Sequence, residues 1–146
     1  MEWMFLPFKR YAEFHGRSCR REYWMFTLLQ FCVLMVAILI PGVLTGFEFL
    51  EQESARFDFG GMLFFILLGI LFFIFLIPSI AVNIRRWHDL GYSGWMFVIF
   101  AVVGAIPYIG GIASIVNIIW FTQRGTIGAN QYGEDPLGEE YVAPIV

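Results

Sequence analysis

Charged residues are absent from three long stretches of this chain, 23–47, 59–84 and 90–123. They make up only 14% of the sequence, against about 25% in an average soluble domain, while hydrophobic residues make up 59%. A chain of 146 residues is too small to bury so much apolar surface in one core. About 20 apolar residues suffice to cross a bilayer as a helix, which satisfies its own backbone hydrogen bonds. The sequence therefore excludes an ordinary soluble domain and predicts an all-α membrane protein.

Cysteine and histidine are scarce, with two of each. On a continuous helix Cys19 and Cys32 would lie about 20 Å apart, beyond the reach of a disulfide bond. With so few candidate ligands we expect no metal site, no cofactor and no catalytic residues, and serine hydrolase and zinc signatures are missing. A cleaved signal peptide is not expected, because the first apolar run is long and no small-residue cleavage site follows it.

The charges that are present are sorted along the chain. The basic residues that precede the first apolar stretch are Lys9, Arg10, Arg17, Arg20 and Arg21. Two more, Arg85 and Arg86, follow the second stretch, whereas the segment 48–58 holds four acidic residues and one arginine. Lys and Arg beside a membrane span stay in the cytoplasm. We therefore expect the N-terminus and the loop around Arg85 inside, and the segment 48–58 outside.

The chain divides into three parts. Residues 1–22 are expected to form a cytoplasmic segment at the membrane interface, with a short helix after Pro7. Residues 23–121 form the helical transmembrane domain, and residues 123–146 form a polar tail rich in turns.

The first two spans are expected at about 23–44, ending at Pro41–Gly42, and at about 61–82. The third stretch is ambiguous, because Pro107 and the pair Gly110–Gly111 interrupt it. One kinked span would leave the C-terminus outside. A hairpin of two short helices, about 92–106 and 109–122, would return it to the cytoplasm, and the strength of the break favours this hairpin. The predicted fold is thus a multi-pass helical bundle of three to four membrane segments.

Residues 85–95, RRWHDLGYSGW, hold more chemistry than a membrane anchor requires. Anchoring and an aromatic belt account for the arginines and tryptophans. They do not account for the His88–Asp89 pair, Ser93 or the two glycines. Gly91 and Gly94 would permit a turn with positive φ.

Asp89 has two further structural interpretations. Asp89 or Ser93 would cap a helix that begins near Trp95. Alternatively, Asp89 would pair with Arg20 or Arg86 across the inner ends of the first two spans.

Three segments together resemble the domain of unknown function 805 family, small bacterial inner-membrane proteins. They are residues 14–24 (FHGRSCRREYW), 85–95 and 128–136 (GANQYGEDP), in that order. The resemblance covers about residues 8–136, with two departures: Trp87 replaces the usual leucine, and the acidic loop is longer than expected. It implies a bacterial inner-membrane location and a hairpin-like last pair of helices. It implies no activity.

If the last stretch is a hairpin, all three segments meet in a polar cap on the cytoplasmic face. The candidate residues for lipid or partner contact are Arg17, Arg20, Arg21, Glu22, Trp24, Arg85, Arg86, His88, Asp89, Gly91, Ser93, Gly94, Trp95, Asn130, Tyr132 and Asp135. Such a cap would tie the helix ends together, or it would bind anionic headgroups, to which each nearby cation contributes about 1 kcal/mol.

Three functions from different classes follow. The leading hypothesis is a non-enzymatic inner-membrane component that engages a protein partner or anionic lipid through the cap. The second is an oligomeric small transporter or channel subunit, in which Gln30 or Asn117 would matter because no ionisable group lies inside a span. The third is a membrane enzyme that acts on a phosphorylated headgroup at His88 and Asp89. We expect contacts with membrane lipids, compatibility with a homo-oligomer, and no binding to nucleic acid.

These hypotheses make different predictions for the arginines. A structural cap predicts that Arg86→Ala or Asp89→Ala lowers the melting temperature. A lipid-binding cap predicts that Arg85→Ala abolishes lipid retention and leaves stability nearly unchanged.

Overall fold

The computed structural model describes residues 2–45 and 59–138. Over these residues the chain forms helices and no β-strand, apart from one isolated bridge between Asn130 and Gly133. The helices are α1 (Glu2–Lys9), α2 (Arg20–Thr45), α3 (Phe59–Asp89), α4 (Trp95–Gly104) and α5 (Ile109–Thr122). The segment 48–58, expected outside the cell, and the last residues of the predicted tail lie outside the described residues.

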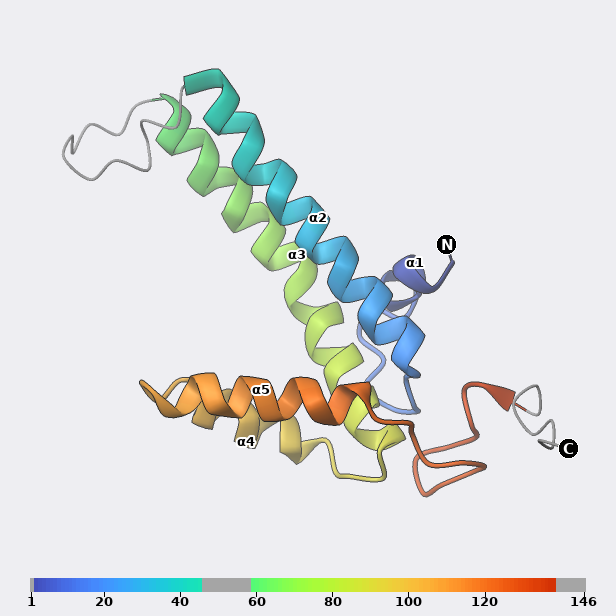
Figure 1. Cartoon of the computed structure of the whole chain (residues 1–146). Coiled ribbons are helices and arrows are strands. Elements are labelled where there is room, and N and C mark those ends of the chain that lie inside the picture. The colour runs from blue at the N-terminus through green and yellow to red at the C-terminus, as the bar shows by residue number, and fades with distance from the viewer. Residues whose placement is uncertain (1, 46–58, 139–146) are drawn as a thin grey trace, which may run out of the picture.

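Helices α2 and α3 form a long antiparallel pair that lies side by side (Figure 1). They contain 26 and 31 residues, or about 39 and 46 Å at the helical rise of about 1.5 Å per residue. Both are long and apolar enough to cross a membrane, whose hydrocarbon core is about 30 Å thick. Large apolar side chains such as Phe31, Val36, Phe65 and Phe73 are exposed along them. The chain is a helical membrane protein.

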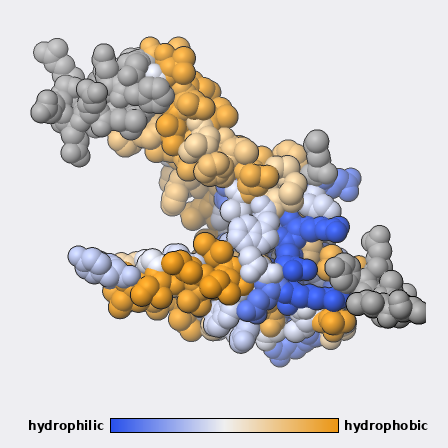
Figure 2. Space-filling model, viewed as in Figure 1, coloured by the Kyte–Doolittle hydropathy of each residue, from blue (hydrophilic) through white to orange (hydrophobic). Residues whose placement is uncertain are grey.

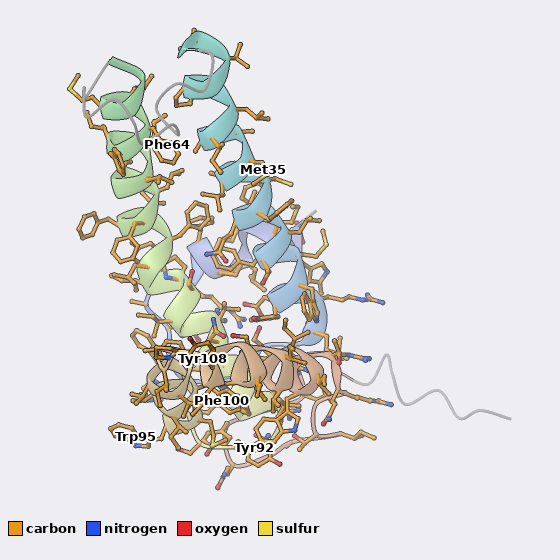
Figure 3. All side chains as sticks on the ribbon, turned by 60° about the vertical axis from the view of Figure 1, so that its left-hand side comes forward. Met35, Phe64, Tyr92, Trp95, Phe100 and Tyr108 are labelled. Atoms are coloured by element: carbon orange, nitrogen blue, oxygen red, sulfur yellow. The ribbon has the colours of Figure 1, made fainter. Side chains whose placement is uncertain are left out.

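The predicted break in the third apolar stretch is confirmed. Helix α4 ends at Gly104 and α5 begins at Ile109, with Pro107 between them and Tyr108 at a φ of 65°. The two helices contain 10 and 14 residues, about 15 and 21 Å, so each is shorter than the hydrocarbon core. Figures 1 and 3 both show this short hairpin crossing the lower end of the α2–α3 pair at a steep angle.

Trp87 of α3 packs against the short hairpin. Its side chain is 1% exposed and lies among four aromatic rings from the turn before α4, from α4 and from α5. These rings belong to Tyr92, Phe100, Trp120 and Phe121, with centroids 5.1–5.9 Å from that of Trp87. Aromatic pairs in this range add to the free energy of simple burial. Trp87 is therefore the centre of the helix junction.

The N-terminal helix differs from the prediction. The helix lies at Glu2–Lys9 and contains Pro7, whereas the sequence predicted a helix after that proline. The ring of Phe8 lies between Phe26 of α2 and Phe75 of α3, at 5.5 and 5.2 Å. Packing of this half-buried aromatic side chain, together with burial of Pro7, stabilises the earlier helix.

The predicted end of the first span near residue 44 agrees with α2, which continues to Thr45, but the expected stop at Pro41 is wrong because Pro41 lies inside the helix. Helix α3 continues past residue 82, the expected end of the second span, to Asp89. Arg85 and Arg86 are therefore helical and do not lie in a loop. Helix α3 ends in a Schellman motif, in which Gly91 N–H donates to His88 and Tyr92 N–H donates to Trp87. Gly91 has a φ of 84°, as the sequence predicted for a glycine in this turn.

Candidate functional site

The N-terminal end of α2 and the C-terminal ends of α3 and α5 meet around a cluster of buried polar side chains, which we call the cap core. Its members are Arg17, Ser18, Glu22, Arg85, Arg86 and Asp89, each at most 4% exposed. Figure 2 shows hydrophilic surface gathered over this end of the molecule, and apolar surface over both helix pairs. Isolated buried charges are very costly, so the pairing of these groups decides whether the junction is stable.

Asp89 holds two arginines. Its Oδ1 lies 3.0 Å from Nε and 2.9 Å from Nη2 of Arg17, and its Oδ2 accepts a hydrogen bond from Arg86 Nη1. The sequence predicted Arg86 as a partner, and that pair is confirmed. The alternative partner, Arg20, was wrong, because Arg17 occupies the other carboxylate oxygen. The proposed role of Asp89 as a helix cap is also wrong, because Gly94 is the N-cap of α4 and no side chain caps this helix.

The arginines also satisfy the exposed carbonyls at the C-terminal end of α5. Arg86 Nη2 donates to the carbonyls of Phe121, at 3.1 Å, and Gln123, while Arg20 Nη1 donates to that of Thr122 at 3.2 Å. The last turn of α5 contains no basic residue of its own. A helix C-terminus carries unpaired carbonyls and a partial negative charge. Cations from α2 and α3 therefore complete α5 and bind the hairpin to the long helices.

Arg85 and Glu22 form a second buried pair, with Nη2 of the arginine 3.0 Å from Oε1 of the carboxylate. Arg85 is 0% exposed and Glu22 is 1% exposed. The N–H groups of Arg85 are not aligned for a hydrogen bond, and Nε and Nη1 have no partner among the described residues. The attraction is therefore mainly one of charge. Buried in this way, Arg85 offers no atom to a headgroup at the surface.

The third segment, 128–136, closes over the end of α3. The Nη1 of Arg17 donates to the carbonyl of Gly128 at 2.5 Å, and Asn130 Nδ2 donates to the carbonyl of His88 at 2.9 Å. The ring of Tyr132 stacks on the imidazole of His88, with centroids 3.9 Å apart and planes 4° apart. Asp135 Oδ2 accepts the Gly128 N–H at 3.2 Å, which stabilises the turn itself. All three segments singled out in the sequence therefore meet at this end of the molecule.

Gly94 is required for a reason that the sequence did not suggest. Its φ is −58°, so no positive φ is needed there. A Cβ at this position would lie 2.8 Å from Ile84 Cγ2 and 3.2 Å from His88 Nε2. Gly94 thus lets the start of α4 approach α3 closely. Ser93 is exposed, and its Oγ lies 3.4 Å from the Trp95 N–H, too long for a strong cap.

Sequence reasoning missed Gly125 and Thr126. A Cβ on Gly125 would collide with the Asp89 carboxylate. Thr126 donates its N–H to the Asp89 carbonyl at 2.8 Å, and its own carbonyl accepts a hydrogen bond from Arg17. The glycine was the only available signal, because a Gly-Thr dipeptide after an apolar helix is otherwise unremarkable.

The remaining candidate residues lie outside the cap core. Arg21 is exposed, Arg20 and Trp24 are half-buried, and Trp95 is 73% exposed. Figure 3 shows Trp95 at the outer edge of the molecule, near the start of α4. These side chains face the surroundings and remain available for contact.

The side chains of His88 and Asp89 have different partners. The carboxylate is held by Arg17 and Arg86, while Nδ1 of the imidazole lies 3.2 Å from the carbonyl of Gly16. Within 2–45 and 59–138, no three His, Cys, Asp or Glu side chains lie together as metal ligands. Burial raises the pKa of the Cys19 thiol, which keeps it protonated and poorly nucleophilic.

The polar groups within the apolar helices mainly link neighbouring residues. Gln30 Nε2 donates to Ser79 Oγ at 2.5 Å and thereby joins α2 to α3. Asn83 Nδ2 donates to the Ser79 carbonyl of its own helix at 2.8 Å. Asn117 lies on α5, where its Oδ1 is buried without a partner among the described residues. The involvement of Gln30 or Asn117 in transport stays a prediction.

Comparison with known proteins agrees with the membrane assignment. Residues 11–134 match the family described as "Protein of unknown function (DUF805)". The chain is 34% identical to the inner membrane protein YhaH of Escherichia coli K12 over 136 residues, which cover 93% of this chain and 97% of YhaH. It is also 34% identical to the inner membrane protein YhaI of the same strain over 137 residues, with coverage of 93% and 96%. No solved structure matches.

Proposed function

This chain belongs to the DUF805 family of proteins of unknown function, with relatives in the bacterial inner membrane, and from that premise we propose that it is a non-enzymatic membrane component that binds anionic phospholipid headgroups. In this proposal the cap core is structural. The binding surface is the arginine face at the start of α2, formed by the half-buried Arg20 and the exposed Arg21.

The proposal rests on the difference in exposure between the arginines of the cap core and those at the start of α2. Arg17, Arg85 and Arg86 are buried and paired with carboxylates. Arg21 is exposed, and Arg20 is half-buried with one N–H on the Thr122 carbonyl. Both are next to cap-core residues in the sequence, and both precede the apolar part of α2. They therefore stand where hydrocarbon gives way to headgroups, which is where cations attract anionic lipid.

The engagement of His88 and Asp89 supports a non-enzymatic role. Asp89 is committed to two arginines, so it is not available as a base for a substrate. The proposed orientation has the cap in the cytoplasm, in agreement with the basic residues around it. The arginine face would then meet the inner leaflet, whose anionic lipids attract polybasic segments.

Native mass spectrometry of the protein in polymer nanodiscs tests the proposal. Loss of two cations near the surface removes about 2 kcal/mol of attraction, or about thirtyfold in lipid affinity. We therefore expect Arg20→Ala/Arg21→Ala to retain about thirtyfold less anionic lipid than the wild type. Arg20→Lys/Arg21→Lys keeps both charges and serves as the matched control, with lipid retained.

Two results would overturn the proposal. One is equal retention of anionic lipid by the wild type and the alanine variant, at equal melting temperature. The other is a copurifying protein, in place of a lipid, that the alanine variant loses.

A further inference from the structure

An open groove of about 370 Å³ lies between the end of α3 and the start of α4, apart from the arginine face. Its lining residues are Ile84, His88, Ser93, Gly94, Trp95 and Val98. None of these carries a formal charge except for His88 when protonated. We infer that this groove binds the primary ammonium headgroup of an aminophospholipid.

His88 supplies the acceptor. Its Nδ1 lies 3.2 Å from the Gly16 carbonyl, and a carbonyl only accepts hydrogen bonds, so Nδ1 carries the ring proton. The other ring nitrogen, Nε2, then carries a lone pair that has no partner among the described residues. The stack with Tyr132, at 3.9 Å, and the bond to Gly16 together fix the plane of the ring. The imidazole is therefore a preorganised acceptor.

Gly94 keeps this acceptor open. A Cβ at position 94 would lie 3.2 Å from His88 Nε2 and would cover it from the groove. Ser93, which is exposed, adds a hydroxyl to the lining of the same groove. The polar half of the groove therefore offers a lone pair and a hydroxyl to a hydrogen-bond donor.

The lining favours an ammonium over an anion. An anionic group placed against the imidazole would find no Lys or Arg among the lining residues to pair with. A primary ammonium has three N–H donors for the imidazole and the hydroxyl. Trp95, 73% exposed at the edge of the groove, adds a ring that attracts cations. Each polar feature of the groove thus fits a small cationic donor.

The other half of the groove selects a lipid over a free amine. Ile84 and Val98 are aliphatic, and they belong to the two apolar helices that flank the groove. An amphiphile would place its ammonium at His88 and its glycerol and acyl portions along these side chains. A water-soluble amine would leave them uncovered. This inference concerns a site separate from Arg20 and Arg21, so it stands or falls independently of the proposed function.

The test compares two zwitterionic lipids. Short-chain phosphatidylethanolamine has N–H donors, whereas phosphatidylcholine has the same charge and none. Native mass spectrometry of the full-length protein, titrated in detergent with each lipid, should show at least tenfold greater retention of phosphatidylethanolamine. His88→Phe preserves an aromatic ring for Tyr132 and removes the acceptor, so it should reduce this preference to about one. His15→Phe, the matched control at the other histidine, should keep the preference.

A second variant and a competitor complete the test. Trp95→Leu changes an exposed side chain and should lower the retention of both lipids at least fivefold. This variant tests the proposal even if His88→Phe fails to fold. The proposal is overturned by equal retention of the two lipids in the wild type, by an unchanged preference in folded His88→Phe, or by unchanged retention in Trp95→Leu. Displacement of the lipid by an equal concentration of free ethanolamine would overturn the lipid assignment.

Discussion

Arg17 and Asp89 lie 72 residues apart in the sequence and form a buried ion pair, with Nη2 of the arginine 2.9 Å from Oδ1 of the aspartate. The same carboxylate accepts a hydrogen bond from Arg86, and the backbone carbonyl of Asp89 accepts one from Thr126 at 2.8 Å. One residue therefore connects the segment before α2, the end of α3 and the chain that follows α5. The cap core should form as a unit, because the loss of any one segment would leave buried polar groups on the others without partners.

Asp89→Asn should destabilise the protein by about 3–5 kcal/mol, because it leaves Arg17 and Arg86 buried without a counter-ion. Thermal unfolding in detergent measures the effect. Glu134→Gln removes a carboxylate from an exposed position of the tail and should leave the melting temperature nearly unchanged. Equal melting temperatures for the two variants would show that the buried pairs contribute nothing.

Arg85→Met should also destabilise the protein by about 3–5 kcal/mol, since Glu22 would lose its counter-ion while remaining 1% exposed. A lipid-binding role for Arg85 predicts the opposite, namely a variant whose stability is nearly unchanged. Glu22→Leu should have a similar cost. The double variant Glu22→Leu/Arg85→Met should be more stable than either single variant, because a buried pair is often replaced by apolar side chains without loss.

Additive losses in that double variant, measured as free energies of unfolding, would contradict the pairing of Arg85 with Glu22. Arg21→Ala is the matched control for the loss of one arginine, and its exposed position predicts little change in stability.

The adjacent glycines of α5 should respond in opposite directions to alanine. A Cβ on Gly110 would collide with the backbone carbonyl of Gly104, so Gly110→Ala should cost about 1–3 kcal/mol by forcing α4 and α5 apart. A Cβ on Gly111 meets nothing within 4 Å, so Gly111→Ala should be neutral or stabilising by about 0.5–1 kcal/mol. Unfolding in detergent measures both, and a stable Gly110→Ala variant would contradict the close approach of the two helices.

The two terminal segments should be accessible from the same side of the membrane. Arg17 binds the carbonyls of Thr126 and Gly128, which holds the tail against the segment before α2. With Cys32 replaced by serine and Cys19 left buried, a cysteine introduced at His15 or at Gln131, both exposed, should react with an impermeant maleimide only after the inner membrane is permeabilised. Labelling of position 131 in intact spheroplasts would place the tail outside the cell and contradict the proposed orientation.

Several features of the fold were predictable because they depend on neighbouring residues. The runs without charge predicted α2 and α3, and Pro107 with the glycine pair predicted the break between α4 and α5. Gly91 predicted the positive φ that ends α3. Hydropathy and turn chemistry act over a few residues, so the sequence alone expresses them. It failed at the end of α3, where Arg85 pairs with the distant Glu22 and Arg86 pairs with Asp89 one helical turn ahead.

The roles of the charged residues were decided only by the tertiary structure. The sequence by itself determined a helical membrane protein with its cations gathered near the helix ends. It did not determine that Arg85 is buried with Glu22, that Arg17 pairs with Asp89, or that Gly94 makes room for His88. These pairings join residues 6 to 72 positions apart. The physical reason is that burial and ion pairing depend on which side chains meet when the helix ends converge, and only the packed junction sets those distances.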